Sequence, residues 1–532
     1  MRGADLQPEA VGRGVSGRIE AVVLAPVAPL FCALLLMLIP LASADAKEAD
    51  WFVYLGSHTP PKAPPKQMSA AEALPPLPLP ATPLRRTERK KPPPPDYLVG
   101  KVIWGDSASF TDTNGKEMKI ADWNLCPTDI RRLLEKARQA GLAYYWQNVN
   151  LSDFHYDPEK LPVLLFSGAR TLRLSKAHID ALRNYVLDGG TVICDSIAGS
   201  PYFHESCKRA FLQALPECRF RPVPPDHPLL HMLADVGRVT VRGGTPGEPR
   251  LECMYIGSRI GVLLSPHGLG CGWNRDLHRV AQVPQATFYP VKDAQAIGLN
   301  LIAYCVGYHE AALVESRPEL YGRVDQKEPT NEFVFAQIKH NGAWNVHPGA
   351  ATTLLGKVRQ HTTIRVNLKR QIVDPEVDDL SAYAFLYLTG MDEFTFAPQA
   401  VTALKAFLRS GGFLFINNGL GLSTFDRAVR RELARIIPGA TLQSIPPTHD
   451  LFKSPFKIEE VRYCPAVTQE GDLLGGRPRF RGIVIGGEWR VLYSPYDLEA
   501  GWLPADYPLI RGYESQSAER LGMNVIAYIM TH

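Results

Sequence analysis

The sequence predicts an α/β fold used twice, as two tandem domains that each contain a doubly wound, mostly parallel sheet. Two observations carry this prediction: matching residues recur at a nearly constant shift over some 200 residues, and short apolar runs alternate with helical patterns in both copies. The length agrees, because 532 residues exceed what one hydrophobic core supports. The 45% of hydrophobic residues and 21% of charged residues exclude a wholly disordered chain.

The repeat is visible as small groups of matching residues in the same order. Residues 161–190, LPVLLFSGARTLRLSKAHIDALRNYVLDGG, align at a shift of 222 with residues 383–412, YAFLYLTGMDEFTFAPQAVTALKAFLRSGG. The Trp-Asn pair at 123–124 recurs at 344–345, and Gly-x-Asn-x-x-Ala-Tyr recurs near the end of each copy. We therefore place the copies at residues 97–310 and 331–532, with a polar joint at 311–330.

Each copy repeats the same predicted elements. Apolar runs predict strands at 142–146, 163–166, 191–194 and 262–265 in the first copy, and at 364–367, 384–388, 413–416 and 491–494 in the second. Ser175 is positioned to cap a helix that runs to 187 and ends at Gly189, and Pro398 suits the first turn of its counterpart. Further helices are predicted at 130–140 and 351–359, and at the end of each copy, near Tyr304 and Tyr528.

The N-terminus has the pattern of an export signal. Arginines occur in residues 1–20, residues 21–42 carry no charge, and Ala42-Ser43-Ala44 is a small-x-small cleavage site. We predict a signal peptide at 1–44 and an exported protein of the periplasm or cell envelope. The apolar run is also long enough to span a bilayer, so a signal anchor is the alternative.

Residues 45–96 are predicted to be a proline-rich basic linker. Thirteen of the 45 prolines lie between His58 and Asp96, together with seven Lys or Arg and three acidic residues. Such a stretch favours extended polyproline II and acts as a spacer. Its basic cluster could also approach anionic lipid. The rest of the chain is close to neutral, which leaves no electrostatic footprint for nucleic acid.

Several spaced motifs of residues 331–532 resemble one bacterial family. They include YLTG, LRSGGFLFINNGLG, SPYDLEAGW and GMNVIAY, and the first copy carries diverged versions such as FSGARTL and GLNLIAY. The sequence resembles two tandem copies of domain of unknown function 4159. That family is similar to the class I glutamine amidotransferase-like superfamily, so the resemblance implies flavodoxin-like domains. It assigns no activity.

The amidotransferase-like relatives use a cysteine on a sharp strand-to-helix elbow with a histidine base, and this sequence lacks the expected small-residue pattern around such a cysteine. Cys194 is the nearest candidate, but its counterpart in the second copy is Ile416, which favours a core position. We therefore predict no catalytic residue, and the sequence shows no metal motif and no cofactor motif. One or two disulfides within the first copy are conceivable, with the pairing open.

The candidate ligand-binding residues are polar groups that recur at predicted strand ends or in proline-stiffened loops. Doubly wound sheets bind ligands at the carboxyl ends of their strands. The candidates are Asp195, Ser196, Asn417, Asn418, His227 and His449. The two histidines have an alternative role, which is to bond their own loop backbone. Asn300 and Asn524 are expected to tie down a loop. Trp273 and Trp502 are expected to pack in the core, with stacking on a sugar as the alternative.

Three functions remain open from the sequence. The first is an exported, non-catalytic envelope protein whose two domains bind a small ligand or a partner protein. The second is a hydrolase or amidotransferase acting on a sugar or amide, with Cys194 or Asp195 and either His227 or His267 as working groups. The third is a membrane-anchored structural subunit in which residues 21–42 provide the anchor.

Overall fold

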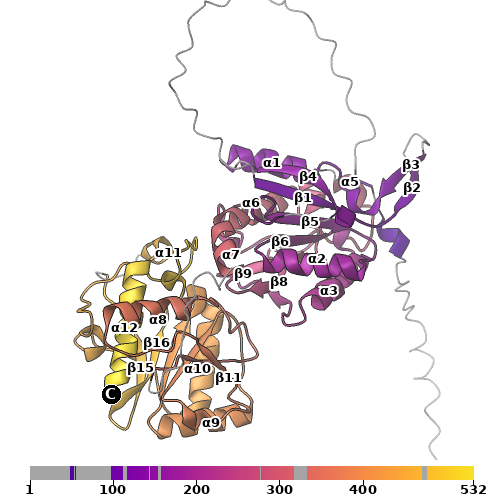
Figure 1. The fold of residues 1–532 in the computed structure, drawn as a ribbon. Coiled ribbons are helices and arrows are strands. Elements are labelled where there is room, and N and C mark those ends of the chain that lie inside the picture. Colours follow the sequence, from indigo (N-terminus) through magenta and orange to yellow (C-terminus); the bar gives the residue numbers. More distant parts are fainter. Residues whose placement is uncertain are drawn as a thin grey trace, which may run out of the picture. The chain divides into compact units, whose positions relative to one another are not determined.

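A computed structural model describes residues 48–52, 54–55, 97–111, 115, 117–142, 144–153, 157–275, 277–316, 332–469 and 476–532. Within these ranges each copy forms a seven-stranded sheet covered by helices, which confirms the two tandem α/β domains (Figure 1). The predicted signal peptide at 1–44, most of the linker at 45–96 and most of the joint at 311–330 lie outside the described residues. We call the two domains repeat 1 and repeat 2.

The sheet of repeat 1 has the order β4-β1-β5-β6-β9-β8-β7. Its strands are β1 (Tyr97–Ile103), β4 (Tyr144–Asn150), β5 (Val163–Gly168), β6 (Thr191–Ser196), β7 (Arg221–Pro222), β8 (Glu252–Ile256) and β9 (Arg259–Ser265). The first five strands in this order are parallel and follow the flavodoxin-like order 2-1-3-4-5, whereas β8, near the other edge, is antiparallel to both β9 and β7. A separate hairpin joins β2 (Ser107–Thr111) to β3 (Glu117–Ala121).

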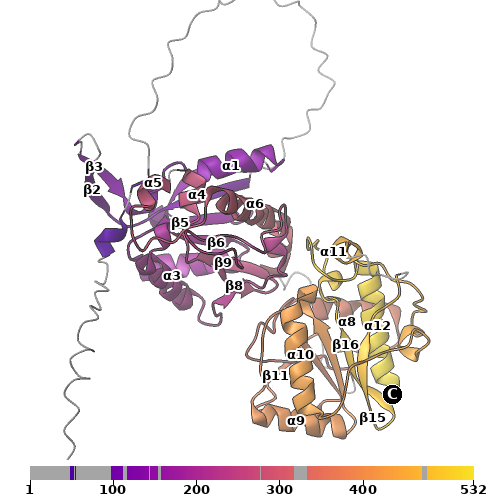
Figure 2. The same ribbon diagram turned by 180° about the vertical axis from the view of Figure 1, so that it is seen from behind.

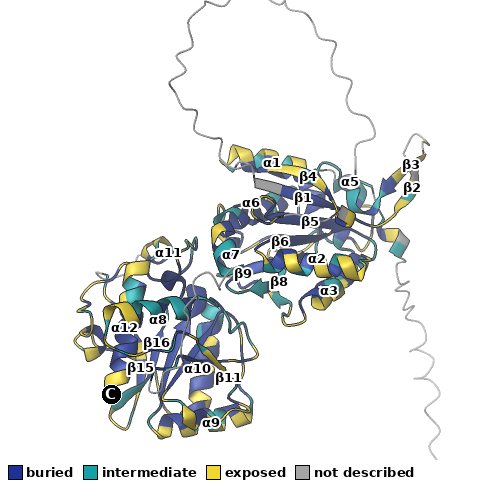
Figure 3. Cartoon of the chain, in the orientation of Figure 1, coloured by how far each residue is buried: buried dark blue, intermediate teal, exposed yellow. Residues whose placement is uncertain are grey.

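Helices cover both faces of the repeat 1 sheet. Alternate side chains of each central strand therefore enter two different cores. Val163 and Leu165 of β5 belong to one core, while Leu164 and Phe166 belong to the other. The α1 and α6 helices lie over the first core, and α2 and α3 over the second (Figures 1 and 3). The helices are α1 (Asp129–Gln139), α2 (Lys176–Leu187), α3 (Pro201–Ala214), α4 (Gly270–Asn274), α5 (Leu277–Val280), α6 (Val291–Gly307) and α7 (His309–Ser316).

Repeat 2 has the same strand order, β11-β10-β12-β13-β16-β15-β14. Its strands are β10 (Ala336–Ile338), β11 (Gln371–Val373), β12 (Phe385–Gly390), β13 (Phe413–Asn418), β14 (Gln443–Ser444), β15 (Arg481–Ile485) and β16 (Glu488–Ser494). The helices are α8 (Ala350–His361), α9 (Pro398–Arg409), α10 (Ser423–Ile436), α11 (Pro465–Thr468) and α12 (Ser515–Thr531), which Figure 2 shows from behind. Strand by strand, the two sheets therefore correspond.

The helix boundaries follow the predicted signals. The Ser175 side chain accepts a hydrogen bond from the His178 N–H at the start of α2, and Gly189 takes a φ of 114° beyond its end. Pro398 occupies the first turn of α9. These capping predictions are confirmed.

Two strand predictions need correction. Residues 364–367 form no named strand: Val366 makes a single bridge with Phe333, and β11 follows at Gln371–Val373. The strand expected from 142 begins at Tyr144, because the Leu142 N–H still bonds Ala137 O at the end of α1. Neither β1 and β10, which come first along the chain in their sheets, nor the strands of the antiparallel edge were predicted from the sequence.

A short N-terminal segment packs on repeat 1, and we call residues 48–52 with 54–55 the strap. It contains the single turn Glu48–Trp51, and both Trp51 and Leu55 are buried. The Leu55 N–H donates to Leu125 O over 2.8 Å, and Asn274 Nδ2 donates to Leu55 O. Part of the stretch predicted as linker therefore belongs to the core of repeat 1.

Candidate functional site

A strained turn joins a central strand to a helix in each repeat. In repeat 1 it lies between β6 and α3, where Ala198 has φ 58° and ψ 8°. In repeat 2 it lies between β13 and α10, where Leu420 has φ 55° and ψ 0°. Left-handed backbone is costly for residues other than glycine, and a strained residue between strand and helix is where nucleophile elbows hold their reactive side chain. Here the two positions hold buried Ala and Leu, which carry no reactive group.

Each elbow is hydrogen-bonded to the segment that follows the neighbouring strand of its sheet, which is β9 in repeat 1 and β16 in repeat 2. In repeat 2 the Leu420 N–H donates to Asp497 Oδ2 over 2.9 Å, and the Arg511 N–H donates to Leu420 O. In repeat 1 the Ala198 N–H donates to Cys271 Sγ over 3.4 Å, and the Thr287 N–H donates to Ala198 O. The backbone arrangement is the same, whereas the side chain that accepts the elbow N–H differs.

The predicted residues Asp195 and Asn417 occupy equivalent positions at the ends of β6 and β13. Asp195 Oδ1 and Oδ2 accept 2.7 Å hydrogen bonds from the N–H groups of Leu269 and Gly270. Asn417 Oδ1 accepts from the Leu498 N–H, and its Nδ2 donates to Asp497 Oδ1. Both side chains are fully buried, so each fastens the loop that follows β9 or β16.

The carboxyl group of Asp195 is easily protonated. Burial raises its pKa to about 7; the two backbone N–H groups oppose this shift, and the charge of Asp129 adds to it. Ser196 and Asn418 are the next residues along and are also buried. Asn418 Nδ2 donates to the carbonyls of Leu422 and Pro495. These predicted residues therefore share one edge of each sheet.

The predicted histidines lie elsewhere. His227 Nδ1 accepts a hydrogen bond from the Leu229 N–H, and its ring is 5.7 Å from that of Tyr304, whose hydroxyl meets Ile260 at the start of β9. His449 makes the equivalent bond to the Leu451 N–H. They sit at the amino end of β9 and β16, away from the strand ends that carry Asp195 and Asn417. The backbone-bonding alternative matches these contacts. Burial lowers the pKa of His227 to about 3.

A buried cation lies at the strand ends of repeat 1. Lys101 of β1 forms a 2.8 Å ion pair with Asp129 and donates to Cys126 O. Its Nζ also lies 3.4 Å from Asn124 Oδ1 and 5.9 Å from the centre of the Trp123 ring. Because buried ions are expensive to desolvate, such a group persists only when it is paired and bonded on several sides.

Repeat 2 builds the same cluster from a different position. Arg370, just before β11, donates to Asn345 Oδ1 over 2.7 Å, and its guanidinium lies 6.0 Å from the Trp344 ring centre. It also donates to Gln337, the residue that matches Lys101 in the sheet register. The Trp-Asn pair noted in the sequence thus contacts a cation in both repeats, and both indoles are half-buried.

A buried carboxylate completes each cluster. In repeat 2 it is Glu499, whose Oε2 accepts a 3.1 Å hydrogen bond from Thr389. Burial raises the pKa of Glu499 to about 7; His347 opposes the shift and Asp497 adds to it. In repeat 1 the equivalent residue is Gly270, and a Cβ there would lie 3.4 Å from Asp129 Oδ2. The carboxylate of Asp129 therefore reaches, from the start of α1, the region that Glu499 fills from the later loop.

An ion pair supports the elbow of repeat 2. His347 Nδ1 lies 2.7 Å from Glu315 Oε1, and His347 Nε2 lies 3.5 Å from Asp497 Oδ2. Burial alone would lower the pKa of His347, but the two carboxylates outweigh it and raise the pKa to about 10. Glu315 of α7 also accepts hydrogen bonds from Ser258 and Tyr507. His347 is therefore a charged structural group at neutral pH.

A family model described as domain of unknown function (DUF4159) matches residues 120–306 and residues 334–530, which are most of both repeats. The chain belongs to this family. No curated protein matches the chain. The DUF4159 match confirms the tandem copies that the sequence motifs predict.

The other residues discussed from sequence have structural contacts in the DUF4159 copies. Asn300 and Asn524 each bind the backbone of a neighbouring loop, at Ala234 and Phe456, as predicted. Trp273 and Trp502 are buried and donate to carbonyls of the last helical region of their copy. These tryptophans therefore pack in the core, unlike the half-buried Trp123 and Trp344.

The structure joins none of the described cysteines of the DUF4159 copies in a disulfide. Cys194 is fully buried and lies against Cys207 in the core between β6 and α3. No group of three or more His, Cys, Asp or Glu side chains in the described ranges is placed to hold a metal ion. No single described helix is long and apolar enough to cross a membrane; α6 and α7 meet that criterion only as a pair bent by 47°.

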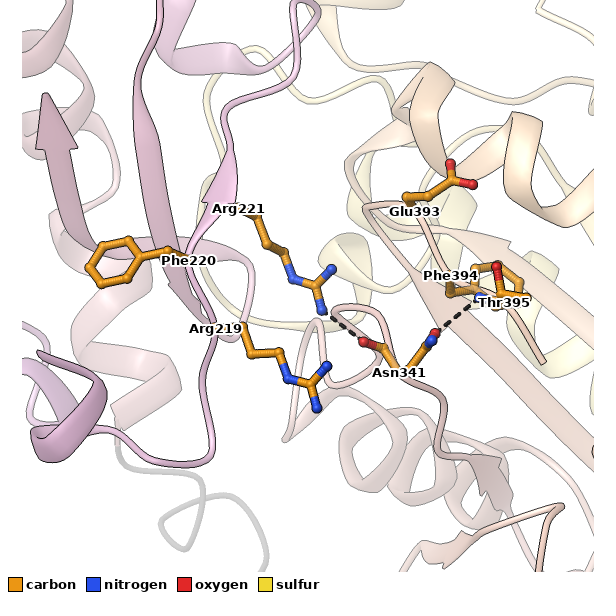
Figure 4. Close-up of a pocket in the computed structure, with 7 residues that line it drawn as sticks. All are labelled: Arg219, Phe220, Arg221, Asn341, Glu393, Phe394 and Thr395. Atoms are coloured by element: carbon orange, nitrogen blue, oxygen red, sulfur yellow. Dashed lines mark hydrogen bonds between the residues drawn. The ribbon is translucent and has the colours of Figure 1, made fainter. Parts of the chain in front are cut away.

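A cavity of about 210 Å³ is lined by Arg219, Phe220, Arg221, Asn341, Glu393, Phe394 and Thr395 (Figure 4). Arg221 donates to Asn341 O over 2.8 Å, and the Thr395 N–H donates to Asn341 Oδ1. Arg221 also pairs with Asp392. None of the residues predicted from the sequence lines this cavity, so it is separate from the strand-end clusters.

Five residues of these clusters are not among those predicted from the sequence: Lys101, Asp129, His347, Arg370 and Glu499. The recurring Trp-Asn pair was the available signal, since it marks the cation in both repeats. The charged residues themselves do not recur at matching positions, so the repeat does not mark them.

Proposed function

We propose that this protein is exported to the cell envelope and that its two DUF4159 domains bind a ligand or a partner protein without catalysing a reaction. One observation carries the non-catalytic part. Each repeat keeps the strained strand-to-helix elbow, yet the position that would present a nucleophile holds Ala198 or Leu420. A strained turn without a reactive group supports binding and architecture rather than covalent catalysis.

The clusters at the strand ends support the binding part. Both repeats place a half-buried indole beside a cation, with Trp123 next to Lys101 and Trp344 next to Arg370. A partly exposed indole offers an apolar face with a polar N–H, which suits contact with a ligand or a protein side chain. This edge is also where doubly wound sheets bind their ligands.

The hydrolase alternative has less support. Cys194 is buried in the core and its neighbour is another thiol, Cys207. His227 lies at the opposite ends of the strands, and His267 Nδ1 is engaged with Thr287 Oγ1 over 2.9 Å. The contacts of these candidates bring no general base to a nucleophile.

Catalysis can be tested on the full mature protein. We expect native protein to release no ammonia from L-glutamine, and we expect Cys194 to resist labelling by an iodoacetamide probe because its thiol is buried. Ammonia release that disappears in Cys194→Ala would refute the non-catalytic proposal.

Export can be tested by cell fractionation. The exported protein should begin near Asp45 in an envelope fraction; a full-length protein in the cytoplasm would refute export.

Binding can be tested by photo-crosslinking in cells. A photoreactive amino acid at position 344 should give a discrete adduct with a ligand or partner, and position 123 provides the same test for repeat 1. Arg409, exposed at the end of α9, is the matched control position. Adducts at 344 or 123 that are absent at 409 support the proposal, whereas equal adducts at all three positions, or none, contradict it.

A further inference from the structure

The elbow of repeat 2 rests on two ionised side chains that come from different loops. His347 precedes α8, Asp497 follows β16, and their atoms Nε2 and Oδ2 are 3.5 Å apart. Asp497 Oδ2 also accepts the Leu420 N–H. The ion pair therefore ties the start of α8 to the loop after β16, directly beneath the elbow.

Repeat 1 has two thiols in the same place. Cys126 aligns with His347 at the shift of 221, and it neighbours Cys271 in the buried cluster that contains Ala198. Gly268 aligns with Asp497 at the shift of 229, and a Cβ on Gly268 would lie 2.8 Å from Cys271 Sγ and 3.0 Å from the Ala198 N. The Cys271 sulfur thus stands where repeat 2 places the Asp497 side chain, and it accepts the elbow N–H in the same way.

We propose that Cys126 and Cys271 form a disulfide in the exported protein, as the covalent counterpart of the His347–Asp497 ion pair. The two thiols lose two protons and two electrons as the S–S bond forms. The electrons reduce the disulfide of a thiol oxidoreductase in the exporting compartment to a dithiol. This inference rests on the export part of the proposed function.

The burial of both thiols sets the time at which the bond forms. Each sulfur is inaccessible in the folded domain. Burial and the neighbouring Cys271 hold the pKa of Cys126 well above its usual range. Thiolate, the form that attacks a disulfide, is therefore scarce once the domain has folded. We place the oxidation during folding, when the loop before α1 and the loop after β9 first meet.

The other thiol pair provides an internal comparison. Cys194 of β6 and Cys207 of α3 are also in contact, but their counterparts in repeat 2 are the apolar residues Ile416 and Val429. These two thiols therefore do not correspond to an ion pair in repeat 2, and both side chains lie within the apolar core of repeat 1. We expect Cys194 and Cys207 to remain thiols.

Mass spectrometry tests the pairing directly. Protein isolated from the envelope is denatured with N-ethylmaleimide and no reductant, and then digested. A linked peptide pair containing Cys126 and Cys271 supports the inference. Both residues carrying N-ethylmaleimide in protein that begins near Asp45, or a Cys194–Cys207 link with Cys126 and Cys271 free, overturns it.

Refolding separates this inference from the proposal of export. Denatured, reduced full-length protein is refolded with oxidised glutathione, which becomes two molecules of reduced glutathione for each bond formed. A Cys126–Cys271 link that forms here, but is absent from cellular protein that keeps residues 1–44 in the cytoplasm, refutes export and leaves the pairing supported. Failure to form the link here refutes the pairing, whatever the location of the protein.

Thermal unfolding gives a second readout. Reduction should lower the midpoint of the wild-type protein by about 10 °C, because the bond closes a loop spanning most of repeat 1. Cys271→Ala, which installs the residue of repeat 2 at this position, should lose that dependence on reductant. Cys305→Ala is the control, since Cys305 is buried without a thiol neighbour, and it should keep the dependence. Equal dependence in both variants would overturn the inference.

Discussion

The two repeats share strand order, elbow and loop positions, yet they stabilise the same edge of the sheet with different chemistry. Repeat 1 places thiols beneath its elbow and covers them with the strap, whose Trp51 and Leu55 join the cluster around Ala198. Repeat 2 places His347, Asp497 and Glu315 there. In both copies a side chain accepts the elbow N–H and contacts a residue that precedes the first helix. The residues that make this link differ between the copies.

The cations of the two clusters also come from different positions. Lys101 of repeat 1 matches Gln337 in register, and Arg370 supplies the charge of repeat 2 from another loop. The carboxylate moves as well, from Asp129 to Glu499. Both domains therefore contain a cation and a buried carboxylate beside the Trp-Asn pair, although the charged residues come from different positions in the two copies.

The largest expected effect comes from the ion pair of repeat 2. His347→Ala leaves the buried carboxylates Glu315 and Asp497 without their cation, so unfolding should become easier by about 3–5 kcal/mol. Urea unfolding measures this loss, and hydrogen exchange should locate it in α8. Cys126→Ala in reduced protein is the matched control and should cost about 1 kcal/mol. Equal losses would remove the contrast between the two fastenings.

The buried lysine ranks next. Lys101→Gln installs the residue that repeat 2 has at this position, but without an arginine like Arg370 nearby. Because Asp129 then keeps a buried charge without its cation, we expect a loss of about 3 kcal/mol in the free energy of unfolding. Arg131→Gln removes an exposed charge from the same region and should change it by less than about 0.5 kcal/mol. A neutral Lys101→Gln would show that the cluster does not need its cation.

The third prediction concerns pH. The folded pKa of Asp195, about 7, lies above its ordinary value of 3.8, so the folded protein binds more protons than the unfolded chain between these values. Asp195 therefore lowers stability as pH rises through this window, by about 1.4 kcal/mol per pH unit. Asp195→Asn, which mimics Asn417, should remove that slope from the pH dependence of urea unfolding. The exposed Asp188→Asn should leave it intact, and an unchanged slope in Asp195→Asn would contradict the assignment.

The smallest effect is expected at the elbow. Ala198→Gly relieves the left-handed strain at φ 58° and should stabilise repeat 1 by up to about 1 kcal/mol. Ala403→Gly, in the ordinary backbone of α9, should destabilise by about 1 kcal/mol. The opposite signs, measured by thermal unfolding, separate strain from the general effect of adding glycine.

Much of the fold was predictable because it depends on patterns that the repeat presents twice. The buried strands around residues 163–166 and 413–416, the Ser175 cap and the loop-binding Asn300 all follow from local sequence. The first strand of each sheet was not predictable in the same way. Its sequence in repeat 1, YLVGKVI, contains a lysine that is buried only because Asp129 meets it from another element.

The candidate site was predictable only in part. Asp195 and Asn417 could be found because they are polar, recur and end predicted strands, and they do share one edge of their sheets. Arg370 and Glu499 could not, because repeat 1 does not carry the same charge at the matching positions and supplies it from different segments: Gly270 is the counterpart of Glu499, and Asp129 provides the carboxylate. Side chains from separate loops meet only in the tertiary structure. A residue-by-residue comparison of the copies therefore does not reveal that they form a cluster.

The strap has a consequence for the proline-rich stretch. Leu55 is bonded within repeat 1, and β1 begins in the same domain at Tyr97, so the chain on either side of residues 56–96 belongs to one domain. The connection from repeat 1 to residues 1–44 therefore leaves from Glu48 and does not run through this stretch. A protease that cuts within it should leave a nicked but assembled protein, held together by Trp51 and Leu55, and the two pieces should separate only on denaturation.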